Sequence, residues 1–172
     1  MKKILSIIGV ISLIGASITS LVACNTPQEY TPEELAKLKE KNKIDTINQE
    51  IRDNLEWIEP QEKPFNKGNQ KLYFVIWKHG NDWILTKFKD SYIVGNISLF
   101  TELDKKSSFS LKINKIFSEL GVENNNTKKI TTWSSSWKNK DPIKSVYRWN
   151  GKEKKLPNLY INENCNVKVS GE

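Results

Sequence analysis

The chain has 172 residues, a formal net charge of +7 at pH 7, 37% hydrophobic residues, two cysteines and one histidine. This composition excludes a disulfide-dense scaffold and a metal site built from four cysteine and histidine ligands, and the length suits one compact domain. Nearly all basic residues are lysines scattered along the chain, whereas nucleic-acid sites gather basic residues on one element. We therefore expect no specific nucleic-acid partner.

The N-terminal segment has the pattern of a bacterial lipoprotein leader. Lys2 and Lys3 precede an uncharged apolar run that ends in Leu21-Val22-Ala23-Cys24, a lipobox. The pattern predicts a signal peptide over residues 1–23 and a mature chain whose first residue, Cys24, carries diacylglycerol and palmitate. Several acyl chains attach a protein stably to a membrane, so we expect the protein on the extracellular face of the cell membrane. The alternatives are an ordinary secretory signal and an uncleaved anchor helix.

A polar tether, residues 24–31, leads to a clear helix start. Thr31 suits the N-cap, Pro32 the first helical position, and Glu34 completes a capping box. Apolar residues then recur mostly every three or four positions from Leu35 to Ile58, which predicts one long helix over residues 32–58. We expect its lysine-rich first half to project as a stalk and its second half to pack on the domain.

Strand patterns follow. The runs 71–77 and 83–88, and a third that starts at Tyr92, predict an antiparallel meander, and short strands are expected at 129–133, 143–149, 158–161 and 167–169.

Residues 107–121 have helical spacing instead, with Ile113, Ile116, Phe117 and Leu120 at i, i+3, i+4 and i+7. The predicted fold class is therefore α+β. It consists of a long N-terminal helix followed by a small, mainly antiparallel β domain over residues 65–172 with one further short helix.

Aromatic residues supply the candidate binding site. Trp133 and Trp137 enclose three serines and are flanked by lysines. In a loop the two indoles would stack on sugar rings or enter a membrane interface, whereas in a strand they would share one face and belong to the core. Alternation in residues 146–149 would bury either Val146 with Arg148 or Tyr147 with Trp149, and we expect the second arrangement, which leaves Arg148 outside. Trp133, Trp137 and Arg148 are thus the candidate ligand-binding residues.

Patterns typical of catalysis are weak. His79 lies in a predicted turn without an activating neighbour, and Cys165 lies in a second predicted turn where we expect an ordinary thiol. We expect no catalytic residue, metal or cofactor. The favoured function is a non-enzymatic interaction or adhesion module that contacts a host glycan or surface protein. The alternative is an enzyme, or an accessory subunit of a surface nuclease or transporter, that acts on an anionic substrate.

Several segments resemble one bacterial family. Residues 1–9, 21–25, 32–35 and 145–151, followed by Pro157-Asn158, are similar to the predicted surface lipoproteins of spiroplasmas, which are wall-less mollicutes. The resemblance implies a protein that faces outward from a single cell membrane. It implies no known activity, ligand or catalytic residue.

Overall fold

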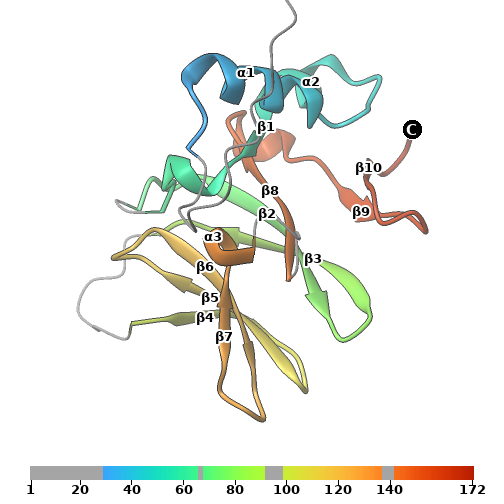
Figure 1. Ribbon diagram of the computed structural model, residues 1–172. Coiled ribbons are helices and arrows are strands. Elements are labelled where there is room, and N and C mark those ends of the chain that lie inside the picture. The colour runs from blue at the N-terminus through green and yellow to red at the C-terminus, as the bar shows by residue number, and fades with distance from the viewer. Residues whose placement is uncertain (1–28, 66–67, 92–98, 137–141) are drawn as a thin grey trace, which may run out of the picture.

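The computed structural model describes residues 29–65, 68–91, 99–136 and 142–172 (Figure 1). The predicted leader and Cys24 lie outside these residues. The described chain is a small β-rich domain with short helices, so the predicted α+β fold with a long N-terminal helix is wrong. The strands form three antiparallel sheets.

Sheet A has the strand order β1-β8-β2-β3, formed by β1 (Leu55–Ile58), β8 (Ile143–Trp149), β2 (Leu72–His79) and β3 (Asp82–Lys89). Sheet B is a meander of β4 (Thr101–Lys105), β5 (Phe109–Asn114), β6 (Glu119–Asn124) and β7 (Ile130–Thr132). A separate hairpin joins β9 (Leu159–Ile161) to β10 (Val167–Val169). The predicted strands 71–77, 83–88, 129–133, 143–149, 158–161 and 167–169 are confirmed with small shifts of their ends. The strand predicted from Tyr92 lies outside the described residues.

Sheet A is the middle of three layers because both of its faces are buried. In β2, Tyr73, Val75 and Trp77 face sheet B, while Phe74 and Ile76 face the opposite side. All five side chains are at most 1% exposed. A strand covered on both faces reads as a continuous apolar run, which is why β2 has no polar alternation.

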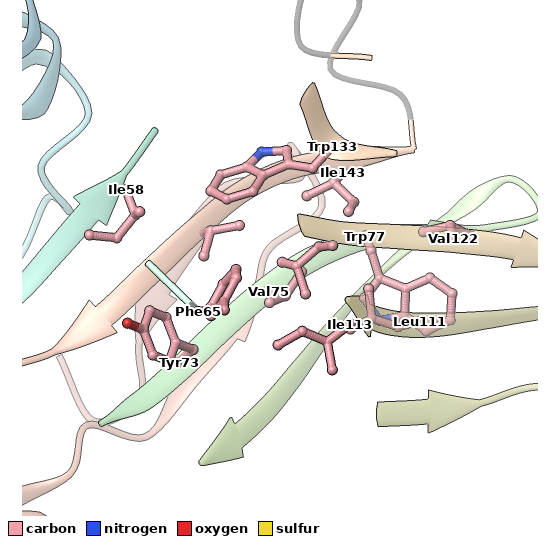
Figure 2. Close-up of a cluster of buried hydrophobic side chains, with 12 residues drawn as sticks. Ile58, Phe65, Tyr73, Val75, Trp77, Leu111, Ile113, Val122, Trp133 and Ile143 are labelled. Atoms are coloured by element: carbon pink, nitrogen blue, oxygen red, sulfur yellow. The ribbon is translucent and has the colours of Figure 1, made fainter. Parts of the chain in front are cut away.

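The inner core lies between sheets A and B (Figure 2). Phe65 packs edge-on against Tyr73, with ring centroids 4.9 Å apart, and Trp133 closes the same cluster from the end of sheet B. Sheet B contributes Leu111, Ile113, Leu120 and Val122.

The outer core lies on the other face of sheet A. It is covered by α1 (Pro32–Lys41), α2 (Gln49–Asn54) and the β9–β10 hairpin. The residues of both cores lie between Leu38 and Val169, so a chain of residues 25–172 retains all of them.

The predicted helix 32–58 begins correctly and then divides into three elements. Thr31 and Glu34 form the expected capping box. The Asn42 side chain then donates to the carbonyl of Leu38 and ends α1, and Asn48 caps the short α2 by accepting from the amide of Ile51. Residues 55–58 have helical spacing, but they are extended because they pair with β8. The hydrogen bonds of Asn42 and Asn48 and the pairing of β1 with β8 therefore decide the structure of this segment, although its apolar residues have helical spacing.

The first part of this segment is also no stalk. Lys39 pairs with Glu56 of β1 and, at 2.6 Å, with Glu62, and Leu38 packs against the outer core. Two carboxylates and one apolar contact therefore hold α1 on the domain.

The second predicted helix, 107–121, is the β5–β6 hairpin. Ile113 and Leu120 face each other across its two strands, and Ile116 and Phe117 lie in the turn. A spacing of seven residues fits two helical turns, but it also brings two residues of a hairpin opposite each other. The Asn114 side chain favours the turn because it accepts from the amides of both Ile116 and Phe117.

A buried hydrogen bond joins this turn to the loop before β2. The amide of Phe65 donates to the hydroxyl of Ser118 at 2.6 Å, and both residues are buried. We expect Ser118→Ala to lower the free energy of unfolding by about 1–3 kcal/mol because a buried amide loses its acceptor. Urea unfolding of residues 25–172 measures the loss. The exposed Ser170→Ala variant is the control, and an equal effect of both substitutions would contradict the assignment.

Candidate functional site

Trp133, the first sequence candidate, lies in the core. It begins the short helix α3 (Trp133–Ser136), is 4% exposed, and its ring centroid is 6.3 Å from that of Phe65. Its edge borders a cavity of about 80 Å³, well below the size of typical ligand sites. This burial favours the core interpretation of Trp133. Trp137 and Cys24 lie outside the described residues.

Arg148, another candidate, belongs to an ion-pair network on the face of sheet A that points toward sheet B. It donates to Glu56 on the neighbouring strand at 2.6 Å, and the same carboxylate accepts from Lys39 and from Asn150. Burial alone would raise the pKa of Glu56, but hydrogen bonds from Lys39, Asn150 and Arg148 hold that pKa at about 2. The guanidinium is thus engaged within the domain, and the structure does not place it beside Trp133 in a common site.

The structure instead forms a groove on the outer face of sheet A, with a volume of about 390 Å³. Three segments distant in sequence line most of it: residues 42–45 between the first two helices, Lys144, Ser145 and Tyr147 of β8, and residues 165–168 at the start of β10. Ile76 of β2 completes the lining. This groove is the candidate functional site.

A β-bulge directs Lys144 into the groove. Ser145 pairs with Ile76 and Ile143 pairs with Trp77, so Lys144 is the extra residue of β8. Its ammonium donates to the carbonyl of Cys165 and lies 5.8 Å from the ring centroid of Trp83. The bulge therefore places a half-buried cation between the sheet and the β9–β10 hairpin.

The floor of the groove contains a neutral hydrogen-bonding group. The hydroxyl of Tyr147 donates to the carbonyl of Asn42 at 3.4 Å, and burial raises the pKa of this tyrosine, so it stays protonated at neutral pH. The hydroxyl of Ser145 is hydrogen-bonded to Tyr147, and the side-chain amide of Asn42 donates to the carbonyl of Leu38, whereas the side-chain amide of Asn166 adds a further donor to the lining.

Positive charge dominates the lining. The lining contains one carboxylate, Asp45, and three lysines, Lys43, Lys144 and Lys168. Lys168 pairs with Asp45 at 2.8 Å, and Lys43 pairs with Glu40 at 2.6 Å outside the groove. Among the described residues, no carboxylate forms an ion pair with Lys144. An ammonium has three donors, and the Cys165 carbonyl uses one of them.

His79 lies away from the groove. Its ring packs edge-on against Trp77 and Phe109, with centroid distances of 6.5 and 6.1 Å. Within the described ranges, no three His, Cys, Asp or Glu side chains come together as a metal site.

The chain matches no protein-family model, no curated protein and no solved structure. In the part of the chain that the structure covers, no helix has both the length and the apolar character needed to cross a membrane. The resemblance to spiroplasma lipoproteins stays a prediction.

Sequence reasoning missed the groove because its lining comes from both ends of the chain. The sequence did predict a turn at one lining residue, Cys165, and the structure confirms this turn. Cys165 lies in the left-handed region, with φ 58°. The lysine at position 144 had no distinguishing feature, since a bulge is set by the pairing of two strands and has no local sequence mark.

Proposed function

We propose that the protein is a lipid-anchored, non-enzymatic binding module on the outer face of the cell membrane, and that its groove binds a compact ligand with a carboxylate or phosphate group. The observation that carries this proposal is the ammonium of Lys144, which lines the groove without an ion-pair partner among the described residues.

The size and chemistry of the groove support this ligand class. A volume of about 390 Å³ falls in the range of sites for small metabolites. A charged group is bound best where a fixed opposite charge and neutral donors converge, and charge-assisted hydrogen bonds are about twice as strong as neutral ones. Lys144 supplies the charge, and the side-chain amide of Asn166 supplies a neutral donor in the same lining.

The anchor is supported by the lipobox at Cys24 and by the short chain that follows it. The domain begins close behind the predicted lipid, because Tyr30 is already held by two hydrogen bonds to the side chain of Gln61, at 2.7 and 3.0 Å. A binding site tethered this closely would sample ligands near the cell surface.

Replacing Lys144 tests the binding site. We expect Lys144→Gln to weaken anion binding by roughly 10–100-fold, the effect of losing a hydrogen bond to a charged group. Isothermal titration of residues 25–172 with inorganic phosphate, succinate and glucose 6-phosphate measures the dissociation constant, and neutral glucose is the comparison ligand. Lys144→Arg should retain most of the affinity.

Lys87→Gln is the matched control, because Lys87 is exposed on strand β3 and lies outside the lining. Bound anion should also slow alkylation of Cys165, the one thiol of this fragment. Equal affinity in the Lys144→Gln and Lys87→Gln variants would contradict the site. Failure of all three anions to bind at about 10 mM would contradict the ligand class. Glucose binding that Lys144→Gln leaves unchanged would favour a neutral glycan instead.

A further inference from the structure

Exposed apolar side chains gather at one end of sheet B. Among the described residues, five large hydrophobic side chains are strongly exposed, and three of them are Leu99 at 56%, Ile116 at 63% and Phe117 at 64%. Thr101 pairs with Ile113, so Leu99 precedes β4 at the same end where the β5–β6 turn follows β5. We call Leu99, Ile116 and Phe117 the apolar end.

The β5–β6 turn holds its apolar side chains in a fixed arrangement. Asn114 accepts from the amides of Ile116 and Phe117 at 3.0 and 3.1 Å, and Ser118 accepts from the buried amide of Phe65. A turn fixed at both ends loses little conformational freedom when it binds a partner.

The charged residue of the turn is directed inward. Lys115 forms an ion pair with Asp90, whose side chain is fully buried, and burial lowers the pKa of this lysine. The ammonium is thus used inside the domain. Its two neighbours along the chain, Ile116 and Phe117, remain in contact with water.

The apolar end is connected to the point where the tether joins the domain. Tyr30 is hydrogen-bonded to Gln61 in the 3-10 helix η1 (Pro60–Glu62), and Phe65, a few residues later, is hydrogen-bonded to Ser118 of the turn. Fully extended, the chain from Cys24 to Tyr30 spans at most about 20 Å. A lipid on Cys24 therefore keeps the bilayer within reach of this side of the domain.

We propose that the apolar end inserts into the bilayer surface next to the lipid anchor and fixes the orientation of the domain. This inference rests on the proposed lipidation of Cys24. Shallow insertion of phenylalanine and aliphatic side chains at the boundary between headgroups and acyl chains is how proteins lie on membranes without crossing them. The acyl anchor and the three side chains add their contributions to membrane binding, because a lipid on Cys24 already holds the turn near the surface.

This orientation leaves the groove accessible. The β5–β6 end of sheet B lies at the left of Figure 1, and the β9–β10 hairpin that borders the groove lies at the right. With the apolar end in the bilayer, the groove faces away from the membrane toward the surroundings of the cell.

Spin labels on the lipidated protein in phospholipid vesicles test the insertion. In a Cys165→Ser background, Phe117→Cys and Asn126→Cys each carry one nitroxide, and Asn126 is an exposed residue in the β6–β7 turn at the other end of sheet B. We expect the label at position 117 to gain collisions with oxygen and to lose collisions with a water-soluble nickel chelate when vesicles are present. The label at position 126 should show neither change.

A second measurement leaves Phe117 unlabelled. Residues 25–172 should partition onto anionic vesicles at least about tenfold more strongly than the Ile116→Ser, Phe117→Ser variant, because two apolar side chains lose their burial. Equal thermal unfolding of the two proteins establishes that the fold is intact.

The outcomes separate the two proposals. The insertion is overturned if the label at position 117 stays in water while the protein floats with vesicles. It is also overturned if the two soluble proteins partition equally. Neither result contradicts the lipid anchor. Full-length protein that does not float, or that floats equally after Cys24→Ser, overturns the lipid anchor. Membrane contact of both labels overturns the proposed orientation.

Discussion

Trp77→Ala is expected to lower the free energy of unfolding by about 3–5 kcal/mol, the usual cost of truncating a fully buried aromatic side chain. Trp77 is 0% exposed and lies in β2, between the two sheets (Figure 2). Its indole also donates to Thr86 of β3 at 2.8 Å, and that hydroxyl donates to Asp104 of sheet B at 2.6 Å. The substitution therefore leaves a cavity and breaks a polar link between the sheets.

Two variants divide this loss into its parts. Trp77→Phe keeps most of the packing and removes the hydrogen bond, so its loss should be clearly smaller. Trp83→Ala removes the same side chain from a partly exposed position on edge strand β3 and should cost less than Trp77→Ala. Guanidinium unfolding of residues 25–172 measures all three. A loss for Trp77→Ala no larger than for Trp83→Ala would contradict the assignment of Trp77 to the centre of the core.

Glu56→Gln is expected to lower the free energy of unfolding by about 2 kcal/mol at pH 7, after allowance for solvent screening of a side chain that is 26% exposed. The carboxylate joins Lys39 of α1 to Arg148 of β8. Glutamine has the same shape, but it cannot balance these two cations. The substitution should loosen α1 and the edge of sheet A together.

The effect of Glu56→Gln should depend on pH in a defined direction. The pKa of Glu56 falls from 4.5 to about 2 in the folded protein, so its carboxylate stabilises the fold fully above pH 4.5. This contribution is lost as the pH falls from 4.5 to 2, because the folded state must then take up the proton that the unfolded state has already bound.

Urea unfolding of wild type and variant at pH 7, 5, 4 and 3 should therefore show a difference that shrinks below pH 4.5. Glu102→Gln is the control, since Glu102 is an exposed carboxylate on strand β4, and surface changes of this kind stay within about 0.5 kcal/mol. A difference between wild type and Glu56→Gln that stays constant from pH 7 to pH 3 would rule out the ion-pair network as its cause.

The sequence was informative wherever local chemistry decides the structure. Thr31 and Glu34 form the expected capping box, and the β-branched and aromatic run of β2 is a strand. It was misleading wherever one spacing suits two structures. Ile113 and Leu120 have the separation of two helical turns, yet they are partners in a hairpin. What decides between these structures is Asn114, whose side chain builds the turn.

Distant partners explain most of the remaining errors. Leu55 and Ile58 continue a helical pattern, but β1 is extended because it pairs with β8, about 90 residues later in the chain. Arg148 was expected outside because alternation assumes that one face of a strand is in water, whereas both faces of sheet A are covered. The groove depends on the same long-range pairing, since the bulge at Lys144 exists only where β8 lies against β2.

The position of β8 between β1 and β2 has a consequence for the order in which the chain folds. Sheet B consists of consecutive hairpins and can form as soon as residues 101–132 are available, because its contacts are local. Sheet A cannot form as early, because among the described strands β1 pairs with β8 alone, and β2 keeps one edge unpaired until residues 143–149 are available. A chain that crosses a membrane from its N-terminus therefore stays incompletely folded until nearly all of it has passed through. In the proposed export of this chain, the late availability of one strand would leave the central layer unformed until translocation is nearly complete.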